Sequence, residues 1–351
     1  MQKDFRIYNS LRPLGWLYGA VTAIRNLLFD NSGSLGKVFP VPVISVGNIT
    51  VGGTGKTPHT EYLVSLLKDK THVAVLSRGY GRCTSGYILA QASSDSITIG
   101  DEPKQISNRF PDIDVAVCED RAYGISTLLS TCRPNVIILD DAFQHRKVTP
   151  SLNILLVNHN RNILSDAMLP AGRLRESAKG RKRAHIIIVT KCPVDMSRKA
   201  MDDMSALLRT DKSQQIFFTT LEYGTPYQLG VPECPVVFPQ GTVLAVTGIA
   251  SPRQLVAELE RQGRKVSLMT FKDHHRYNKE DIKRISDKLQ GMGPDSFVVT
   301  TAKDATRLED MEMDDCLRNR IFVLPVGVKF LGGKDAFDQT VTEHVESFKK
   351  R

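Results

Sequence analysis

The chain carries Gly52-Gly53-Thr54-Gly55-Lys56-Thr57-Pro58 between an apolar run at residues 43–46 and a helix-like stretch at residues 61–67. Glycines in such a loop let backbone N–H groups converge on an anion, and the helix that follows contributes the positive end of its dipole. The order of strand, loop and helix predicts a P-loop, in which a lysine meets the outer phosphates of a nucleotide and a threonine hydroxyl holds Mg²⁺. The predicted phosphate-binding residues are Gly52, Gly53, Thr54, Gly55, Lys56 and Thr57.

The loop departs from the commonest P-loop pattern at Thr50, where that pattern has a glycine five residues before Gly55. It is similar instead to variant loops of the form Gly-Gly-x-Gly-Lys-Thr. One group of ATPases with such a loop carries an additional lysine at the position of Val51. The alternative of a membrane-cycling ATPase switch follows from this likeness, but Val51 and the long second half of the chain count against it.

The composition and the net charge limit the classes to which the protein can belong. The 351 residues have a globular composition and exceed the length of one typical domain, so two α/β units are expected. Six cysteines without paired spacing argue against a disulfide framework and a zinc site, and predict reduced thiols in the cytosol. The net charge of +9 favours an anionic partner, which could be a nucleic acid, a phosphorylated ligand or an acidic membrane surface.

The N-terminal region is amphipathic. Apolar residues recur at helical spacing after Pro13, and arginines lie around them. The uncharged part, residues 14–24, is shorter than the ~20 residues that a membrane-spanning helix needs, and no secretory signal is evident. Two interpretations stay open: a helix that lies in the plane of a membrane surface, and a helix that packs on the domain core.

Alternating strands and helices predict an α/β fold with a P-loop NTPase-like parallel sheet and a second, smaller α/β domain. Proline-rich sequence then interrupts this alternation. We expect a first domain at residues 1–222, a linker at 223–240, and a second domain at 241–351 that includes strands at 297–300 and 321–326 and a closing C-terminal helix. The expected strands of the first domain are residues 43–46, 73–76, 115–118, 136–139, 154–157 and 186–189.

Two acids end the apolar strand at residues 136–139. In P-loop proteins a carboxylate in this position lies beside the Mg²⁺ that binds the nucleotide phosphates, so Asp140 or Asp141 is a candidate metal ligand. Gln144 and His145 follow at the same rim of the sheet, although His145 could instead be a buried structural histidine.

Three further loops concentrate polar residues. Asp101 either caps a helix or has a role in the site. Residues 169–176 form a loop with two arginines and an acid beside the basic run at residues 179–183, which could also be a solvated basic surface. Residues 271–277 cluster titratable side chains before a helix. Residues 188–193 are similar to the guanine-reading segment of GTPases, but Pro193 replaces the aspartate that reads the base, which disfavours GTP.

Taken together, six blocks resemble the tetraacyldisaccharide 4'-kinase family, and they occur in the order of that family. Ala142 and Ala302 depart from the family pattern, which has glycine and glutamate at these positions. The blocks are Val46-Gly47-Asn48 with the P-loop, Ser77-Arg78-Gly79-Tyr80-Gly81, Gly100-Asp101-Glu102-Pro103, Asp140-Asp141-Ala142-Phe143-Gln144-His145, Gly172-Arg173-Leu174-Arg175-Glu176 and Phe271-Lys272-Asp273-His274.

The resemblance implies an ATP- and Mg²⁺-dependent kinase that is peripheral on the cytoplasmic face of the inner membrane of Gram-negative bacteria. It would transfer the γ-phosphate of ATP to the 4'-hydroxyl of a tetraacylated glucosamine disaccharide 1-phosphate. We expect the enzyme to be a monomer and to have no nucleic-acid partner. By this analogy Asp101 accepts the hydroxyl proton and His274 pairs with it, although the two residues lie on opposite sides of the predicted linker. The other implied site residues are Lys56, Gln144 and His145, the phosphate-neutralising Arg78, Arg121 and Arg175, and the metal-binding Thr57, Asp140, Asp141 and Glu176.

A different class of enzyme, a P-loop ligase that activates a carboxylate, would share the loop and the acids at the strand end. Because His274 and Asp101 would have to meet, a kinase of the implied kind requires the two domains to close over the substrate. Domain closure would also exclude water that could hydrolyse ATP.

Overall fold

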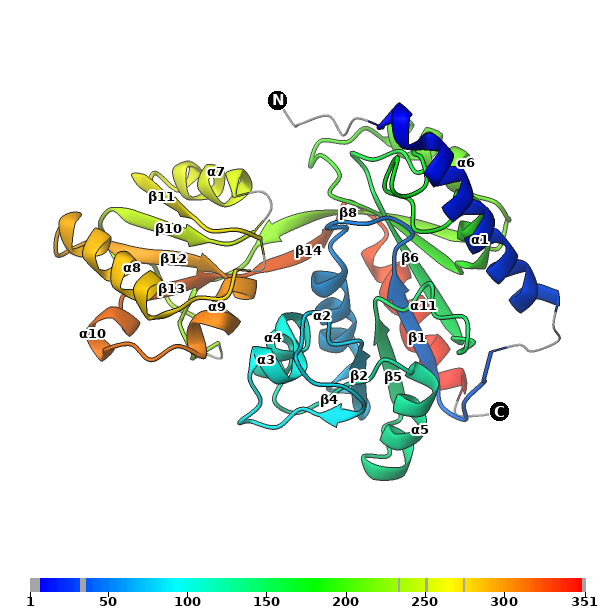
Figure 1. The fold of residues 1–351 in the computed structure, drawn as a ribbon, viewed down its shortest axis with the longest axis horizontal. Helices are drawn as coiled ribbons and strands as arrows, with labels where there is room; N and C mark the ends of the chain where they lie inside the picture. Colours follow the sequence, from blue (N-terminus) through cyan, green and yellow to red (C-terminus); the bar gives the residue numbers. More distant parts are fainter. Residues whose placement is uncertain (1–6, 32–35, 233, 250–251, 274, 349–351) are drawn as a thin grey trace.

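A computed structural model describes residues 7–31, 36–232, 234–249, 252–273 and 275–348. Two sheets, each with its own helices, form the two lobes of the molecule (Figure 1). His274, one of the predicted site residues, lies outside the described residues.

Within these residues the larger sheet has nine strands, and its central seven run parallel. The edge strands β3 and β14 are antiparallel to their neighbours. The central strands β1, β5, β6 and β7 are buried throughout, as the apolar runs in their sequences predict. The order from edge to edge is β14 (Val326–Phe330), β8 (Gln215–Tyr223), β7 (Ile186–Thr190), β6 (Leu152–Asn158), β1 (Val43–Gly47), β5 (Val136–Asp140), β2 (Val73–Ser77), β4 (Asp114–Val117) and β3 (Ile88–Leu89).

Helices cover both faces of the larger sheet. On one face α2 (Lys56–Leu67), α4 (Asp101–Arg109) and α11 (Lys334–Phe348) share a core with β1, β5 and β6. On the other face α5 (Arg121–Thr131) and α6 (Arg198–Leu208) pack on separate clusters. Shorter helical segments are η1 (Asn9–Leu11), α3 (Ser96–Ile99) and η2 (Ala178–Arg183). This arrangement confirms the predicted P-loop NTPase-like layering.

The smaller sheet has five described strands, parallel except for β9. Helix α7 (Arg253–Arg261) covers one face, and α8 (Lys279–Gly291), α9 (Ala302–Glu309) and α10 (Asp315–Arg318) cover the other. Asn278 caps α8 with a reciprocal capping box, as its position before a helical pattern predicts. The strand order is β11 (Val266–Thr270), β10 (Val243–Thr247), β12 (Phe297–Thr301), β13 (Ile321–Leu324) and β9 (Tyr227–Gln228).

The C-terminal segment returns to the larger sheet, which corrects the expectation that residues 241–351 form one unit. Pro325 interrupts the expected strand at residues 321–326, because proline cannot donate a backbone hydrogen bond. The chain therefore leaves β13 in the smaller sheet and enters β14, which pairs with β8. Helix α11 then buries Phe337 in the core of the larger sheet.

The expected linker is also shorter than residues 223–240. Tyr227 and Gln228 already belong to the smaller sheet, through their pairing with β13. The two connections between the sheets lie side by side, since the N–H of Gly224 donates to the carbonyl of Pro325 at 2.9 Å. The smaller unit is thus attached by two adjacent strands, β8 and β14.

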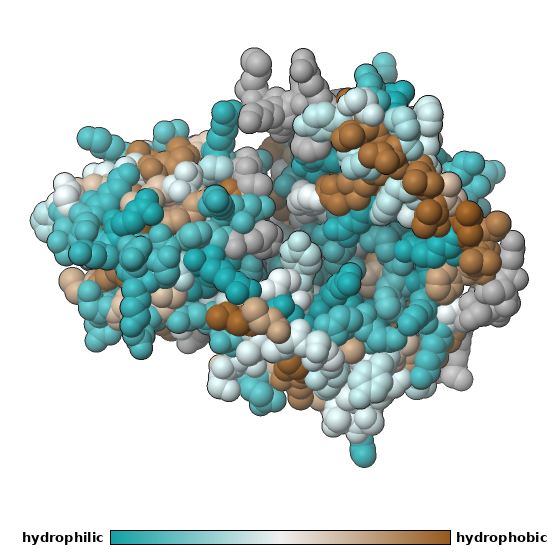
Figure 2. Space-filling view, in the orientation of Figure 1, coloured by the Kyte–Doolittle hydropathy of each residue, from teal (hydrophilic) through white to brown (hydrophobic). Residues whose placement is uncertain are grey.

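Helix α1 (Arg12–Asn31) turns its apolar side chains to solvent. Trp16 is 71% exposed and Leu17 64% exposed, and apolar residues form a continuous patch along the helix (Figure 2). The helix contacts the protein through its small residues, because Gly15 and Gly19 lie against Met168. This geometry does not support the interpretation that the apolar face packs on the core. No helix among the described residues has the length and hydropathy to cross a bilayer.

Candidate active site

The P-loop joins β1 to α2 at the carboxyl edge of the larger sheet. Gly55 precedes the first turn of α2 with a φ of +84°, a conformation that glycine adopts without a steric penalty. Asn48 Nδ2 donates to Thr54 Oγ1 at 2.8 Å, and Thr190 Oγ1 donates to the carbonyl of Thr54 at 2.9 Å. These bonds hold the loop in place, and Thr57 lies in the first turn of α2, where the P-loop pattern puts the metal-binding hydroxyl.

His59 contacts the backbone of the P-loop. It was not predicted as a site residue. Its Nδ1 lies 2.7 Å from the carbonyl oxygen of Gly55, and its Nε2 lies 3.2 Å from Thr219 Oγ1. Burial lowers the pKa of His59 to about 4, so the ring is neutral and donates from Nδ1 to the carbonyl. Its position in the first two turns after the P-loop lysine was the only available signal.

Asp141 lies between two cations. Its Oδ2 is 3.3 Å from Lys56 Nζ and 3.2 Å from Arg175 Nη1. Burial alone would raise the pKa of Asp141, but the charges of Lys56 and Arg175 outweigh it and hold the pKa below its ordinary value. Asp141 also has a φ of +49°, an uncommon backbone conformation that directs the chain out of β5 at the site.

Asp140 is completely buried and has one carboxylate oxygen without a partner among the described residues. Oδ1 accepts a hydrogen bond from Thr60 at 3.1 Å, whereas Oδ2 has no partner. Burial raises the pKa of Asp140 to about 7, and the negative charges of Glu102 and Asp141 add to this effect. A buried carboxylate oxygen of this kind is suited to a cation or to a water molecule that a cation holds.

The donor set fits Mg²⁺ as P-loop enzymes bind it. In the described part of the chain no three His, Cys, Asp or Glu side chains are grouped closely enough to form a protein-only metal site. Mg²⁺ commonly keeps several waters and takes the remaining oxygens from one or two carboxylates and the substrate phosphates. Thr57, Asp140 and Asp141 would provide such a partial set.

Glu176 and Gln144 form a connected network next to the loop. Arg183 Nη2 lies 2.9 and 2.8 Å from the two oxygens of Glu176, so the buried carboxylate is already paired with a cation. Gln144 Nε2 donates to Glu176 Oε1 at 3.2 Å and to the carbonyl of Asn48. Gln144 therefore joins the start of the P-loop to Glu176, and the metal-binding role of Glu176 stays a prediction.

Arg175 reaches the site because its own strand segment runs beside the P-loop. The N–H of Val51 donates to the carbonyl of Arg173, and the N–H of Arg175 donates to the carbonyl of Ile49, both at 2.8 Å. Helix α1 lies next to this segment, since the Tyr18 hydroxyl donates to the carbonyl of Arg175 at 3.1 Å. The exposed apolar helix is thus directly attached to the segment that carries Arg175.

Arg121, Arg78 and His145 lie in different surroundings. Arg121 is buried and donates to the carbonyls of Cys118 and Asp140, and burial lowers its pKa to about 10, so it braces the end of β5. Arg78 follows β2 and is exposed.

His145 is half-buried. Burial, with a further effect from the charge of Arg121, lowers the pKa of His145 to about 4. Its Nε2 has no hydrogen-bond partner among the described residues.

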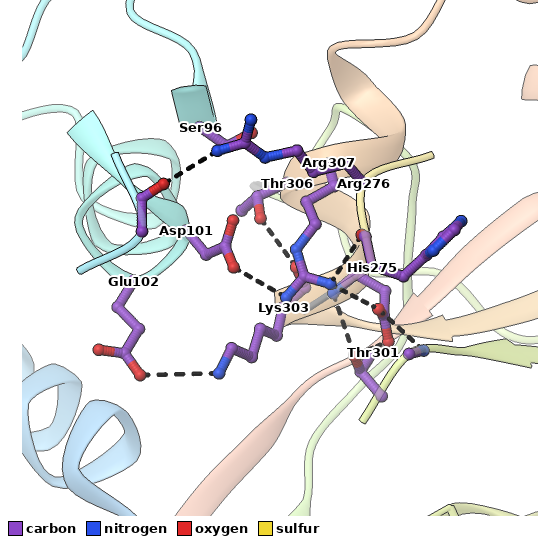
Figure 3. Close-up of polar contacts among 12 residues, drawn as sticks. Ser96, Asp101, Glu102, His275, Arg276, Thr301, Lys303, Thr306 and Arg307 are labelled. Carbon is purple, nitrogen blue, oxygen red and sulfur yellow. Dashed lines mark hydrogen bonds and ion pairs between the residues drawn. The ribbon is translucent and has the colours of Figure 1, made fainter. Parts of the chain in front are cut away.

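Asp101 begins α4, and a residue from the other sheet contacts it. Arg307 Nη2 in α9 lies 2.8 Å from Asp101 Oδ2 (Figure 3). Gln105 and Arg109 of the same helix donate to Glu61 on α2, so α4 packs beside the helix that follows the P-loop. The sequence did not single out Arg307, although it lies five residues after Ala302, one of the two departures from the family pattern. Pairing between Asp101 and His274 stays a prediction.

Comparisons with known proteins give a consistent result. The sequence profile of the family "Tetraacyldisaccharide-1-P 4'-kinase" (LpxK) matches residues 7–346. The chain is 45% identical to a tetraacyldisaccharide 4'-kinase of Bacteroides fragilis, over 98% of this chain and 95% of that protein. It is 43% identical to the one of Bacteroides thetaiotaomicron, over 97% and 94%. The crystal structure of LpxK from Aquifex aeolicus in complex with ATP has a TM-score of 0.77 and 31% identity, covering 96% of this chain and 99% of that one.

Proposed function

Because the chain belongs to the tetraacyldisaccharide-1-phosphate 4'-kinase family, we propose that it transfers the γ-phosphate of ATP to the 4'-hydroxyl of a tetraacylated glucosamine disaccharide 1-phosphate. The products would be ADP and the 1,4'-bisphosphate. The arrangement of Lys56 and Asp141 at the end of the P-loop carries this proposal, because it places a cation for phosphate next to carboxylates for Mg²⁺.

Binding of ATP uses the P-loop backbone and Lys56, which hold the β- and γ-phosphates. Mg²⁺ would be held by Thr57 with Asp140 or Asp141, and it would neutralise charge on the transferring phosphoryl group. Arg175 lies 3.2 Å from Asp141 and is suited to neutralise phosphate charge once the nucleotide is bound. Phosphoryl transfer depends mainly on such positioning and charge neutralisation.

The acceptor hydroxyl gives its proton to Asp101. The sugar oxygen attacks the γ-phosphorus, the bond from that phosphorus to the bridging oxygen of ADP breaks, and the hydroxyl proton moves to the carboxylate. Because a sugar hydroxyl is a very weak acid and aspartate a weak base, the proton moves late, after the new P–O bond has begun to form. His274 is assigned, by analogy with the family, as the partner of Asp101.

The lipid would reach the site from a membrane surface that binds α1. The exposed apolar residues of the helix, including Trp16 and Leu17, support a location in the plane of the headgroup region, and Arg12 and Arg25 suit anionic lipids. The contact of Tyr18 with the Arg175 segment supports this route, because it attaches α1 to the segment that carries Arg175. We infer a peripheral location on the cytoplasmic face of the inner membrane.

The experiment is an assay of the purified full-length chain with γ-labelled ATP and a tetraacyl disaccharide 1-phosphate in mixed micelles. The expected result is label in a lipid whose mass has increased by one phosphate, and Asp101→Asn should lower this rate by about 10²-fold or more. Arg261→Gln, a surface change on α7 far from these residues in the fold, should keep the wild-type rate. ATP hydrolysis at an equal rate without the lipid would contradict the proposal and favour an ATPase switch.

A further inference from the structure

Polar contacts join α3, α4 and the loop after β2 in the larger unit to α9, to Asp310 that follows it, and to the segment before α8 in the smaller unit. Figure 3 shows this contact region, in which side chains from both units point toward one another. Most of these pairs lie near the surface, but the pair of Asp101 and Arg307 is largely buried. The pairs are Asp101–Arg307 at 2.8 Å, Glu102–Lys303 at 3.7 Å, Ser96–Asp310 at 2.6 Å, Asn108–Glu309 at 2.6 Å and Gly81–Arg276 at 3.0 Å.

Arg307 is fixed within its own unit. Its side chain is 3% exposed, and Nη1 donates to the carbonyl of His275 at 3.2 Å and to Asp304 Oδ1 at 3.4 Å. A guanidinium held by two groups on one side of its fork presents the other nitrogen in a defined direction. That nitrogen, Nη2, forms the ion pair with Asp101 Oδ2 at 2.8 Å, without the geometry of a hydrogen bond.

Asp304 in turn holds Arg307 rigidly. The Asp304 carboxylate is completely buried and accepts hydrogen bonds from Thr247 Oγ1, Thr301 Oγ1 and the N–H of Gly248 at 2.8 to 3.0 Å. It therefore is a fixed counter-ion that already balances the charge of Arg307. Arg307 does not require Asp101 for neutralisation, so the contact with Asp101 is additional to the one that stabilises the buried cation.

The charge balance leaves Asp101 usable as a base. Asp101, Arg307 and Asp304 together carry one net negative charge, while Glu102 and Lys303 balance each other. An isolated arginine beside a carboxylate would reduce its basicity strongly, whereas an arginine shared with a second carboxylate reduces it less. The contact can therefore orient the carboxylate while the carboxylate keeps the ability to accept a proton.

We propose that Arg307 is a positioning residue that orients the Asp101 carboxylate toward the acceptor hydroxyl when the two units are in contact. This inference rests on the proposed function, in which Asp101 accepts the proton. Because Arg307 belongs to the smaller unit and Asp101 to the larger one, the base is correctly oriented only while α9 contacts α4. Contact between the units is thereby a condition for proton transfer.

The test measures kcat, KM for ATP and the pH–rate profile of Arg307→Gln in the lipid phosphorylation assay. In the described part of the chain, the charged side chains of this cluster are Glu102 on α4, which follows Asp101, and Lys303, Asp304 and Arg307 on α9. Removing the cation should lower kcat by about 10- to 100-fold with KM for ATP within about twofold, because orientation and not nucleotide binding is lost. The acidic limb of the profile should move to higher pH, since the carboxylate loses a charge that favours its ionised form.

Three further variants make the result decisive. Arg307→Lys, which keeps the charge but not the fork, should return the acidic limb to its wild-type position and recover only part of kcat. Asp304→Asn should move the acidic limb the other way, to lower pH, and this arm also applies if Arg307→Gln does not fold. Arg261→Gln, an exposed arginine on α7, is the matched control and should behave as wild type.

The outcomes separate this inference from the proposed function. Wild-type kcat and pH profile in Arg307→Gln, or an unmoved acidic limb in a folded Asp304→Asn, would overturn the positioning role. If Asp101→Asn is inactive in that case, the proposed function stands without Arg307. Full activity of Asp101→Asn would instead remove Asp101 as the proton acceptor, and the role of Arg307 with it.

Discussion

Lys56 Nζ lies 3.3 Å from Asp141 Oδ2, so the P-loop lysine is paired with a strand-end carboxylate at the site proposed for the nucleotide phosphates. The two residues come from the segments after β1 and β5, which are neighbours in the sheet. Their pairing reflects a general property of parallel sheets, in which the carboxyl ends of adjacent strands place their following residues together.

Replacement of Lys56 by methionine should abolish most of the transfer activity. The change removes a charge that stabilises the transferring phosphoryl group, and we expect kcat to fall by about 10²- to 10³-fold. The measurement is the rate of lipid phosphorylation at saturating ATP. Lys279→Met removes an exposed lysine of α8 and should leave the rate unchanged. A Lys56→Met enzyme with near wild-type kcat would exclude this lysine from the chemistry.

The contribution of Asp140 to the stability of the folded protein should fall as the pH rises toward neutrality. The pKa of Asp140 is about 7 in the folded protein against an ordinary 3.8, so the folded state binds a proton that the unfolded chain has released. The stabilising contribution is complete below about pH 4 and is lost as pH rises through 7. Asp140→Asn should therefore raise Tm at pH 8 by at least about 2 °C in the absence of Mg²⁺ and nucleotide.

Thermal unfolding of wild type and Asp140→Asn between pH 5 and pH 8 measures this effect. The difference in Tm should grow with pH, while the variant loses Mg²⁺-dependent activity. Parallel Tm curves for the two proteins would show that the Asp140 carboxyl is not protonated in the folded state.

Helix α1 contains the single tryptophan of the chain, which makes membrane binding directly observable. Addition of anionic vesicles should shift the emission of Trp16 to shorter wavelength, because the exposed indole enters an apolar environment. Leu17→Asp should weaken vesicle binding by about tenfold or more, since burial of a leucine contributes about 1.5–3 kcal/mol. Leu207→Asp, at an exposed position of α6, is the control and should bind as wild type. An unshifted emission at saturating lipid would contradict an in-plane helix.

Phe337→Ala should destabilise the nucleotide-binding unit, although Phe337 is near the C-terminus. Its ring is fully buried, 5.2 Å from the ring of Phe217 in an edge-on arrangement, and truncation of such a phenylalanine costs about 3–5 kcal/mol. The loss in the free energy of unfolding is measured by urea unfolding, in which a bound ATP analogue reports whether the larger sheet is folded. A variant that keeps its nucleotide affinity and midpoint would mean that α11 is not part of this core.

The sequence was sufficient for the parts of the fold that depend on local patterns. The P-loop, the buried strands and the acids at the end of β5 follow from residue type and spacing, so the place of the loop and the acids at the carboxyl edge of the sheet was predictable. The assignment of α11 was wrong because the apolar face of a helix indicates burial but not the sheet that buries it. The break at Pro325 was the available signal, and its effect depends on the pairing of β14 with β8.

Tertiary contacts determine the remaining features of the site. Nothing in the sequence near Arg307 indicates that its guanidinium meets Asp101, because the contact joins helices of two different sheets. The environment of Asp140 is another example, since its raised pKa depends on burial and on the charge of Glu102. Motifs predicted which residues form the site, whereas the distances between these residues required the folded chain.

The pairing of Tyr223 with Val326 makes the smaller unit an insertion into the larger one. Both ends of the insertion meet at a single rung of antiparallel ladder, so a tight hairpin turn could replace everything between them without changing the register of the flanking strands. The inserted lobe is in this sense a module, and its Arg307 reaches across to Asp101 of the larger lobe.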